Sequence, residues 1–342
     1  MVLNQSKSIN MGVLYNLNYT KTVENILNCL ARIQNYVWQK FVSRLRNNFF
    51  YPIIYKSYWH YIFTKYDSRQ NIFNCFYSAR PNPGAGIGHQ IANWIAGYWY
   101  AKQFDLKYAH SSFSTTEWDS FLGFGENEIT IKELIKSEYK KVRLPLFDEF
   151  NVSEVELQKR IIASYCNRKV IFFAEQDQQY NDQFGVMETL KQKFFNAPFR
   201  INDTLFFDKK FINIAVHVRR GDVAIGKEAN PNLIMRWQGN EYFVNVLRNV
   251  LNSFKSEKSI SIHIFSQGNM DDFVEFKQFE NINFWLNFNP IDSFLHMVYA
   301  DILITSKSSF SYKPALLNKG IKICPKDFWH GYPKTDDWIL VD

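Results

Sequence analysis

The 342-residue sequence has few of the features that mark metal-binding, disulfide-rich or membrane-spanning proteins. Four cysteines are scattered along the chain without a Cys-x-x-Cys pair, which argues against a zinc site and against a disulfide framework: Cys29, Cys75, Cys166 and Cys324. No apolar run reaches the roughly 18 residues needed to cross a bilayer, and no signal peptide is visible. We therefore expect a cytoplasmic protein.

Most of the chain also lacks an excess of either charge. The formal net charge is +7, yet residues 1–70 hold nine Lys and Arg against Glu24 and Asp67, and the remaining chain holds 31 residues of each sign. The basic character therefore belongs to the N-terminal segment alone.

That segment combines a helical pattern with many aromatic residues. Apolar residues recur at helical spacing from Val23 to Leu45, and residues 49–66 interleave Phe, Tyr and Trp with Lys and His. Two alternatives fit: an extension packed on the rest of the protein, or peripheral contact of residues 1–70 with a membrane surface, where aromatic rings and cations meet headgroups. No nucleic-acid partner is expected, because no recognised binding module accompanies these residues.

The most informative stretch is INIAVHVRRGD, residues 212–222. Its apolar, β-branched part predicts a buried strand, and ligands of open α/β sheets bind at the carboxyl ends of strands. Arg219 and Arg220 leave the strand at that end, where buried charge must be paired and guanidinium groups bind phosphate oxygens well. Asp222 can hold an arginine or accept a proton. The alternative is a structural ion pair between Asp222 and one arginine.

Two turns that precede helices offer further anion sites. Residues 84–90 (GAGIGHQ) open a predicted helix that runs through Phe104, and unpaired N–H groups at a helix N-terminus favour anions. Residues 300–305 predict a buried strand, followed by the serine-rich turn SKSSFS at residues 306–311. Both patterns also occur without a ligand, as a tight turn and as an N-cap. Because proline is tolerated only in the first turn of a helix, Pro314 predicts a cap near Ser311.

The remaining pattern predicts an alternation of strands and helices. From residue 205 onward we expect a parallel α/β half, with a helix at 241–254 and strands at 260–265 and 321–325. Asp292 is the expected N-cap of a helix before the strand at 300–305. Residues 223–239, which include Glu228, are expected to form a long polar loop next to the arginines. Earlier, residues 170–173 predict a strand, 184–195 a helix and 198–204 a domain boundary.

The HVRRGD sequence at 217–222 resembles the signature of the fucosyltransferase superfamily, and most closely that of the α-1,2-fucosyltransferases. Two further stretches resemble this family in the same order: GIGHQ at 86–90, where the family has Asn in place of His89, and SSFS at 308–311. Phe265 and Ser266 match the start of the family's Phe-Ser-Asp-Asp element, whereas Gln267 and Gly268 depart from it. The resemblance covers roughly residues 76–330.

The resemblance implies a GT-B-like α/β fold in which two Rossmann-like domains face a cleft. The expected domains are the helical basic and aromatic extension at 1–75, an acceptor-side domain at 76–203 and a nucleotide-sugar-binding domain at 204–342. The implied catalytic residues are Arg219, Arg220 and Asp222, with Glu228 as a second candidate base. The implied donor-binding residues are His217, Arg219, Arg220, Ser266, Ser308, Ser309, Gly86, Gly88, His89 and Gln90.

The expected activity is inverting, metal-independent transfer of fucose from GDP-fucose to a hydroxyl of a glycan acceptor, a galactoside with α-1,2 linkage. We expect no metal and no cofactor, because no Asp-x-Asp motif follows a predicted strand in a plausible donor site, and the arginines would neutralise the leaving diphosphate. One rival is a GT-B enzyme for another nucleotide sugar, which Gln267, Gly268 and His89 favour. Another is a non-catalytic glycan- or nucleotide-binding protein.

Overall fold

The computed structural model describes residues 26, 30, 67–69, 74–79, 84–144, 147–166, 168–173, 183–226, 230–253 and 256–342, without the side chain of residue 232. The chain divides into two compact units, Met1–Lys65 and Tyr66–Asp342. The expected extension at 1–75 lies almost entirely outside the described residues, and so does Glu228. The expected boundary between residues 203 and 204 stays a prediction. None of the described helices is both long enough and apolar enough to span a membrane.

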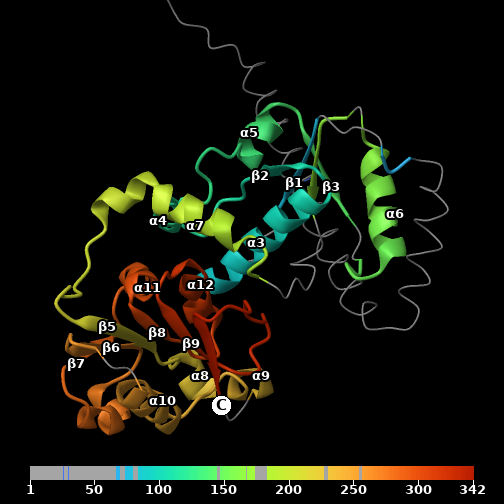
Figure 1. Ribbon diagram of the computed structural model, residues 1–342. Coiled ribbons are helices and arrows are strands. Elements are labelled where there is room, and N and C mark those ends of the chain that lie inside the picture. Colours follow the sequence, from blue (N-terminus) through green and yellow to red (C-terminus); the bar gives the residue numbers. More distant parts are fainter. Residues whose placement is uncertain are drawn as a thin grey trace, which may run out of the picture. The chain divides into compact units, whose positions relative to one another are not determined.

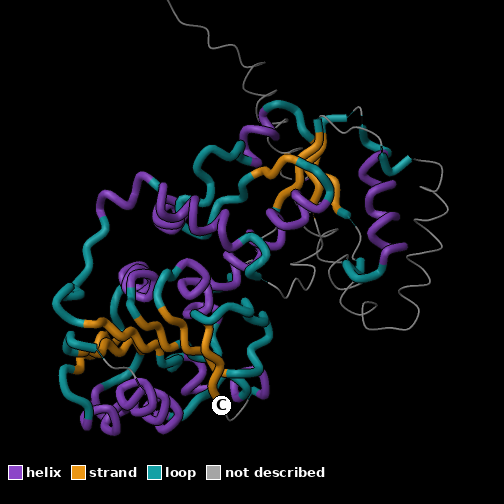
Figure 2. The backbone as a smooth tube through the Cα atoms, in the orientation of Figure 1, coloured by secondary structure: helices purple, strands orange, loops and turns teal. Residues whose placement is uncertain are grey.

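The second unit begins with a four-stranded parallel sheet in the order β2-β1-β4-β3 (Figures 1 and 2). Its strands are β1 (Cys75–Ser78), β2 (Lys107–Ala109), β3 (Lys140–Arg143) and β4 (Val170–Phe173). Every residue of the central strands β1 and β4 is buried. Parallel strands covered on both faces read as continuous apolar runs, which is why residues 170–173 are recognisable in the sequence.

The helices around this sheet are α3 (Ile87–Gln103), α4 (Thr116–Leu122), α5 (Ile131–Lys136), α6 (Val152–Ala163) and α7 (Met187–Asn196), followed by the 3₁₀ helix η1 (Pro198–Asn202). Successive side chains of β1 point to opposite faces. Phe76 belongs to a core cluster with Leu134 of α5, while the ring of Tyr77 contacts Tyr100 of α3 at 6.3 Å between centroids. Helices α3 and α5 therefore cover opposite faces.

The second sheet has six parallel strands in the order β10-β9-β8-β5-β6-β7. They are β5 (Ile212–His217), β6 (Ile260–Ser266), β7 (Ile282–Leu286), β8 (Ile302–Ile304), β9 (Ile321–Pro325) and β10 (Trp338–Val341). Two parallel sheets with connecting helices confirm the prediction of an α/β protein with two Rossmann-like halves.

Helices cover both faces of the second sheet (Figure 1). The helical segments are α8 (Asp222–Gly226), α9 (Pro231–Ile234), α10 (Asn240–Ser253), η2 (Met270–Gln278), α11 (Pro290–Tyr299) and α12 (Ser309–Leu317). Ile214 and Val216 of β5 join one buried cluster with α10 and η2. The alternate residue His217 contacts Phe310 of α12 on the other face, with 5.4 Å between ring centroids.

The structure corrects three local predictions. Residues 223–239 are not a long loop, because they contain α8 and α9. Helix α11 is capped by Asn289, whose side chain accepts the N–H of Ile291 at 2.8 Å, and not by Asp292. The cap of α12 is Ser308 instead of a residue near Ser311, so Pro314 lies inside the helix, where it removes a backbone donor. Strand β10 has no counterpart in the prediction.

Candidate functional site

Both sheets have a topological switch point that places chain turns at the carboxyl edge. In the second sheet, β5 lies between β6 and β8, and the chain builds outward to β7 on one side and to β10 on the other. In the first sheet, β1 lies between β2 and β4, with β3 at the edge beyond β4. Ligands of open α/β sheets bind at such points, beyond the carboxyl ends of the strands. The turn before α3 follows β1, and the serine turn follows β8.

The structure brings these two turns together. A Cβ atom at Gly88 would lie 2.7 Å from the carbonyl carbon of Ser309 and 2.9 Å from the backbone nitrogen of Phe310, so this approach requires glycine. The N-termini of α3 and α12 are therefore in contact. Ile87 and Gly88 of α3 and Ser309 of α12 have backbone N–H groups without partners among the described residues, at the positive ends of two helix dipoles, and this convergence favours an anion between or beside them.

Side chains around the first turn hold it in shape. The carbonyl of Gly86 accepts the N–H groups of His89 and Gln90 at 3.0 and 3.1 Å. The buried Gln90 donates from Nε2 to the carbonyl of Ala85 at 2.7 Å and accepts the N–H of Ser114 at 2.8 Å. Gln90 thus braces the turn. His89 lies in the first turn of α3 and is partly buried.

The second turn is organised by hydroxyl groups. Ser308 accepts the N–H of Phe310 at 3.2 Å as the N-cap of α12. The hydroxyl of Ser306 lies 2.8 Å from Nδ1 of His217, and the Ser309 hydroxyl lies 3.5 Å from Nε2 of His330. The N–H of Ser311 bonds the carbonyl of Ser308 at 3.2 Å, so the N–H of Ser309 is the one in the first turn of α12 that has no partner within the described residues.

His217 is a neutral structural residue at this edge. It is buried, and burial followed by the charges of Arg219 and Arg220 lowers its pKa to about 3. A neutral imidazole is therefore present at every pH near neutrality. Its contacts with Ser306 and Phe310 join the end of β5 to the start of α12. These contacts position the end of β5 next to the serine turn.

The two arginines of the HVRRGD sequence have different surroundings. Arg220 is only 6% exposed and donates to the carbonyls of Arg219 at 2.8 Å and Gln238 at 3.0 Å, and to the Asn240 side chain. Its guanidinium stacks on Trp237 at 4.2 Å. Burial lowers its pKa to about 10, against the opposing charges of Asp272 and Glu275, so it stays protonated near neutral pH. Most of its donors are engaged within the protein.

Arg219, in contrast, is partly exposed and forms an ion pair with Asp222, the first residue of α8. The Asp222 side chain is 58% exposed. Arg219 therefore reaches the solvent edge with donors to spare. The structure thus shows the ion pair that the sequence leaves as an alternative to a ligand role. An exposed pair of this kind contributes little to stability and does not prevent Arg219 from meeting a ligand.

The end of β6 completes the edge. The Ser266 hydroxyl donates to the carbonyl of Val218 at 2.7 Å and ties β6 to the end of β5. Gly221 has a φ of +64°, and a Cβ there would lie 2.1 Å from Oε1 of Gln267. The positive φ favours glycine at 221, and Gln267 occupies the space beside it. Gln267, where the sequence departs from the family pattern, thus lies directly against the turn at residues 219–222, which we call the arginine turn.

Residues 236–238 also contact this site, although nothing in the sequence distinguishes them from a polar loop. Gln238 accepts from Arg220 through its carbonyl at 3.0 Å and from the N–H of Lys307 through Oε1 at 2.8 Å. It therefore links the arginine turn to the serine turn. His330 is the other residue that the sequence does not indicate.

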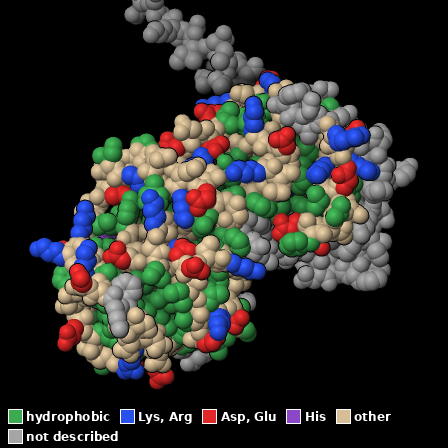
Figure 3. All heavy atoms as spheres, viewed as in Figure 1, with side chains coloured by type: hydrophobic (Ala, Val, Ile, Leu, Met, Phe, Trp, Pro, Cys, Tyr) green, Lys and Arg blue, Asp and Glu red, His purple; other side chains and the backbone are tan. Residues whose placement is uncertain are grey.

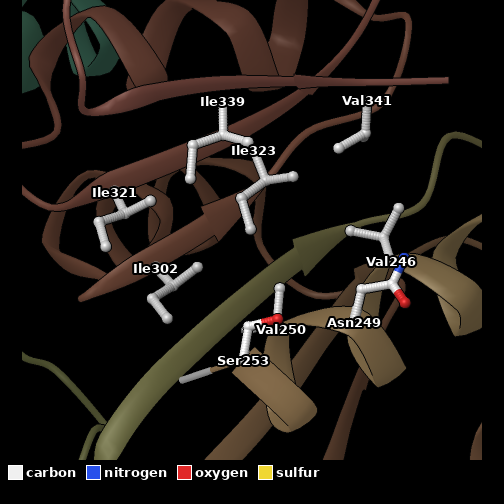
Figure 4. Close-up of a pocket in the computed structure, with 9 residues that line it drawn as sticks. All are labelled: Val246, Asn249, Val250, Ser253, Ile302, Ile321, Ile323, Ile339 and Val341. Carbon is white, nitrogen blue, oxygen red and sulfur yellow. The ribbon is translucent and has the colours of Figure 1, made fainter. Parts of the chain in front are cut away.

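A separate cavity of about 220 Å³ lies between α10 and strands β8, β9 and β10 (Figure 4). Its lining is Val246, Asn249, Val250, Ser253, Ile302, Ile321, Ile323, Ile339 and Val341. Figure 3 shows apolar side chains gathered over the second sheet. Ile302 and Ile321 begin β8 and β9, whereas the candidate site lies beyond the carboxyl ends of these strands. The cavity therefore takes no part in the site.

No three His, Cys, Asp or Glu side chains form a cluster that could hold a metal ion within the described part of the chain. The expectation of a metal-independent reaction stays a prediction.

No protein-family model and no curated protein matches the chain. Among solved structures, POFUT1 in complex with GDP-fucose (crystal form II) is similar with 11% identity and a TM-score of 0.47, covering 80% of this chain and 99% of that chain. The NodZ α-1,6-fucosyltransferase soaked with GDP-fucose has 10% identity and a TM-score of 0.42, covering 73% and 93%. The E. coli heptosyltransferase WaaC with ADP has 10% identity and a TM-score of 0.42, covering 78% and 92%. These likenesses are too distant to assign a function.

Proposed function

We propose that this protein is a GT-B-type glycosyltransferase that moves fucose from GDP-fucose to a hydroxyl of a glycan acceptor, by an inverting and metal-independent reaction. The observation that supports this proposal most strongly is the contact between Gly88 and Ser309, which brings the N-termini of α3 and α12 together. This contact lies at the carboxyl edge of the second sheet, where Arg219 follows β5. The HVRRGD, GIGHQ and SSFS sequences support GDP-fucose as donor through their resemblance to α-1,2-fucosyltransferases. That resemblance also supports a galactoside acceptor.

The proposed reaction is a single displacement. The acceptor hydroxyl oxygen attacks the anomeric carbon of the sugar while the bond from that carbon to the diphosphate oxygen breaks. Negative charge then develops on the leaving diphosphate, and fixed donors aimed at this charge lower the barrier. The N–H groups at the starts of α3 and α12 and the guanidinium of Arg219 would supply these donors. The hydroxyls of Ser308 and Ser309 would add hydrogen bonds to the same phosphates.

We infer different roles for Arg220 and Asp222, the other charged residues of the motif, from their contacts. Arg220, held by Gln238 and Asn240, would shape the arginine turn and add positive charge without direct contact. Asp222 is a candidate base for the acceptor hydroxyl, but its ion pair with Arg219 favours a role in orienting that arginine. Glu228, the second candidate base, lies outside the described residues.

The test is nucleotide release from a panel of GDP-, UDP-, CMP- and dTDP-sugars, with simple galactosides as acceptors, with and without EDTA. Release of GDP from GDP-fucose alone, unchanged by EDTA, is the expected result. Turnover of another nucleotide sugar would show that GDP-fucose is not the donor, and would point to Gln267, Gly268 and His89 as the residues that change the donor specificity. Tight nucleotide binding without turnover of any donor, across a broad acceptor set, would contradict the enzyme and favour a binding protein.

A further inference from the structure

Arg236, Trp237 and Gln238 are consecutive residues that contact the candidate site or the residue Trp329 next to His330. The guanidinium of Arg236 lies over the ring of Trp329 at 5.3 Å from its centroid, and Trp237 stacks on Arg220 at 4.2 Å. Gln238 bonds both Arg220 and the backbone of Lys307. Because the next two residues, Trp237 and Gln238, are anchored to the site, the position of Arg236 is fixed by the chain and by its stacking on Trp329.

Arg236 has no anionic partner in the described part of the chain, where no carboxylate lies within 4.0 Å of its guanidinium. Its Nε is buried and has no hydrogen-bond acceptor. A buried donor without an acceptor costs on the order of 1–3 kcal/mol, and such groups are rare unless a ligand or water satisfies them. Arg219 is paired with Asp222 and Arg220 is bound on several sides, whereas the Arg236 guanidinium has no hydrogen bond or ion pair within the described residues.

A second unsatisfied group lies next to the same tryptophan. The His330 side chain is 7% exposed, and its ring centroid lies 5.9 Å from that of Trp329. Its Nδ1 is buried without a partner, while Nε2 lies 3.5 Å from the hydroxyl of Ser309, the first residue of α12. Burial, and after it the charges of Lys313 and His89, lower the pKa of His330 to about 2, so the imidazole is neutral and can donate or accept one hydrogen bond at Nδ1.

We propose that Arg236, positioned by Trp329 and accompanied by His330, forms an oxyanion-binding subsite beside the N-terminus of α12. Arg236 and His330 both contact Trp329, each has a buried polar atom without a partner, and His330 also reaches the first residue of α12, so together they match the needs of a phosphate or carboxylate group. The subsite deepens the proposed function and depends on it only for the identity of the ligand. The oxyanion is either the diphosphate of the nucleotide sugar or an acid group on the acceptor glycan.

The first experiment measures binding of inorganic pyrophosphate to the full chain by calorimetry, with tryptophan fluorescence as a second readout. Arg236→Gln is compared with Arg248→Gln, which removes the same charge from an exposed position on α10. We expect Arg236→Gln to weaken pyrophosphate binding at least tenfold and Arg248→Gln to stay within about twofold of wild type. Arg236→Lys should restore part of the affinity, because Lys keeps the charge but loses the planar fork of donors. Equal affinities for wild type and Arg236→Gln, or no pyrophosphate binding by wild type, would overturn the subsite.

A melting-temperature comparison separates this role from a structural one. Removing an unpaired buried donor should leave the melting temperature of Arg236→Gln within a few degrees of wild type. Loss of binding that merely follows a large loss of stability would count against the proposal. His330→Gln, which keeps a hydrogen-bonding group, should weaken pyrophosphate binding less than Arg236→Gln does.

Kinetics with GDP-fucose and a glycan acceptor then distinguish the two sources of the oxyanion. A higher KM for GDP-fucose in Arg236→Gln assigns the subsite to the diphosphate, and a higher KM for the acceptor alone assigns it to an acidic acceptor. Unchanged KM values for both would overturn it as a substrate subsite. If wild type binds pyrophosphate through Arg236 but transfers no sugar, the proposed function fails and the subsite stands.

Discussion

The substitution Gly88→Ala tests whether the contact between α3 and α12 matters for function. Its added Cβ would lie 2.7 Å from the Ser309 carbonyl carbon, whereas ordinary contact begins at 3.4 Å, so the two helices must separate by about 0.7 Å. Overpacking of this kind costs about 1–3 kcal/mol, offset by the gain of about 0.5–1 kcal/mol from replacing glycine in a helix. The expected net loss in the free energy of unfolding is up to about 2.5 kcal/mol.

The expected effect on catalysis is larger. A displacement of about 1 Å in the groups that position a reacting centre can lower the rate by about 100-fold, so a separation of this size should lower kcat/KM roughly 10- to 100-fold. The assay is GDP release from GDP-fucose at saturating acceptor, together with pyrophosphate affinity, which should fall in parallel. Urea unfolding gives the stability of each variant at the assay temperature.

Gly97→Ala is the matched control because it adds the same group to the same helix. There the Cβ would lie 2.7 Å from the backbone nitrogen of Ala79 at the end of β1, away from α12. We expect a similar loss of stability and a much smaller loss of kcat/KM. Equal catalytic losses in the two variants would refute the importance of the α3–α12 contact, because they would trace both effects to general destabilisation.

Three further predictions concern charge, acidity and burial. Arg219→Gln should lower turnover roughly 100-fold with little change in melting temperature. Arg220→Gln should also lower the free energy of unfolding by roughly 2–4 kcal/mol, because the buried acceptors of Arg220 lose their donor. Turnover assays and thermal melts of both variants test this, and equal stabilities of the two variants would refute it. Burial, and after it the charge of His296, lowers the pKa of His263 from 6.5 to about 4. As the pH falls through this range, His263 is therefore protonated in the unfolded chain but stays neutral in the folded chain. Stability should therefore fall between pH 6.5 and 4, and His263→Gln should flatten that fall in urea titrations; an unchanged slope would contradict it. Asn318→Ala should cost roughly 2–4 kcal/mol, because the buried amide donates to three carbonyls and accepts the Gly320 N–H at 2.7 Å, and an unchanged urea midpoint would argue against this.

The strands were predictable wherever they are buried on both faces, because such strands have a continuous run of apolar residues in the sequence. The runs at β4, β5 and β8 are of this kind, and each strand forms where the sequence predicts it. The short helices α8 and α9 were missed because propensity over four or five residues is weak. Pro231 at the first position of α9 was the available signal.

Helix starts were harder to predict because several residues can serve as caps. Asn289 and Asp292 are both good capping residues, and Pro290 is what favours Asn289, because proline fits the first helical position. The prediction placed the cap of α12 near Ser311 instead of at Ser308, because proline is normally confined to the first turn of a helix and Pro314 would then lie in that turn. In the structure Ser308 caps α12, and Pro314 lies inside the helix among buried residues.

The candidate site was predictable as a set of motifs but not as a geometry. The sequence identifies the glycine turn, the arginine turn and the serine turn, yet the contact of Gly88 with Ser309 joins distant segments and depends on the packing of the two helices. The difference between Arg219 and Arg220 depends on where Gln238 and Asn240 lie, which no local pattern determines. The same holds for the stacking of Arg236 on Trp329.

The central claim is that the diphosphate of a nucleotide sugar binds where α3 and α12 meet, and a crystal structure of the complex with GDP tests it most directly. The account predicts phosphate oxygens at about 3 Å from the first backbone N–H groups of α12 and from the guanidinium of Arg219. GDP bound elsewhere, with its phosphates far from Ser309 and Arg219, would contradict it.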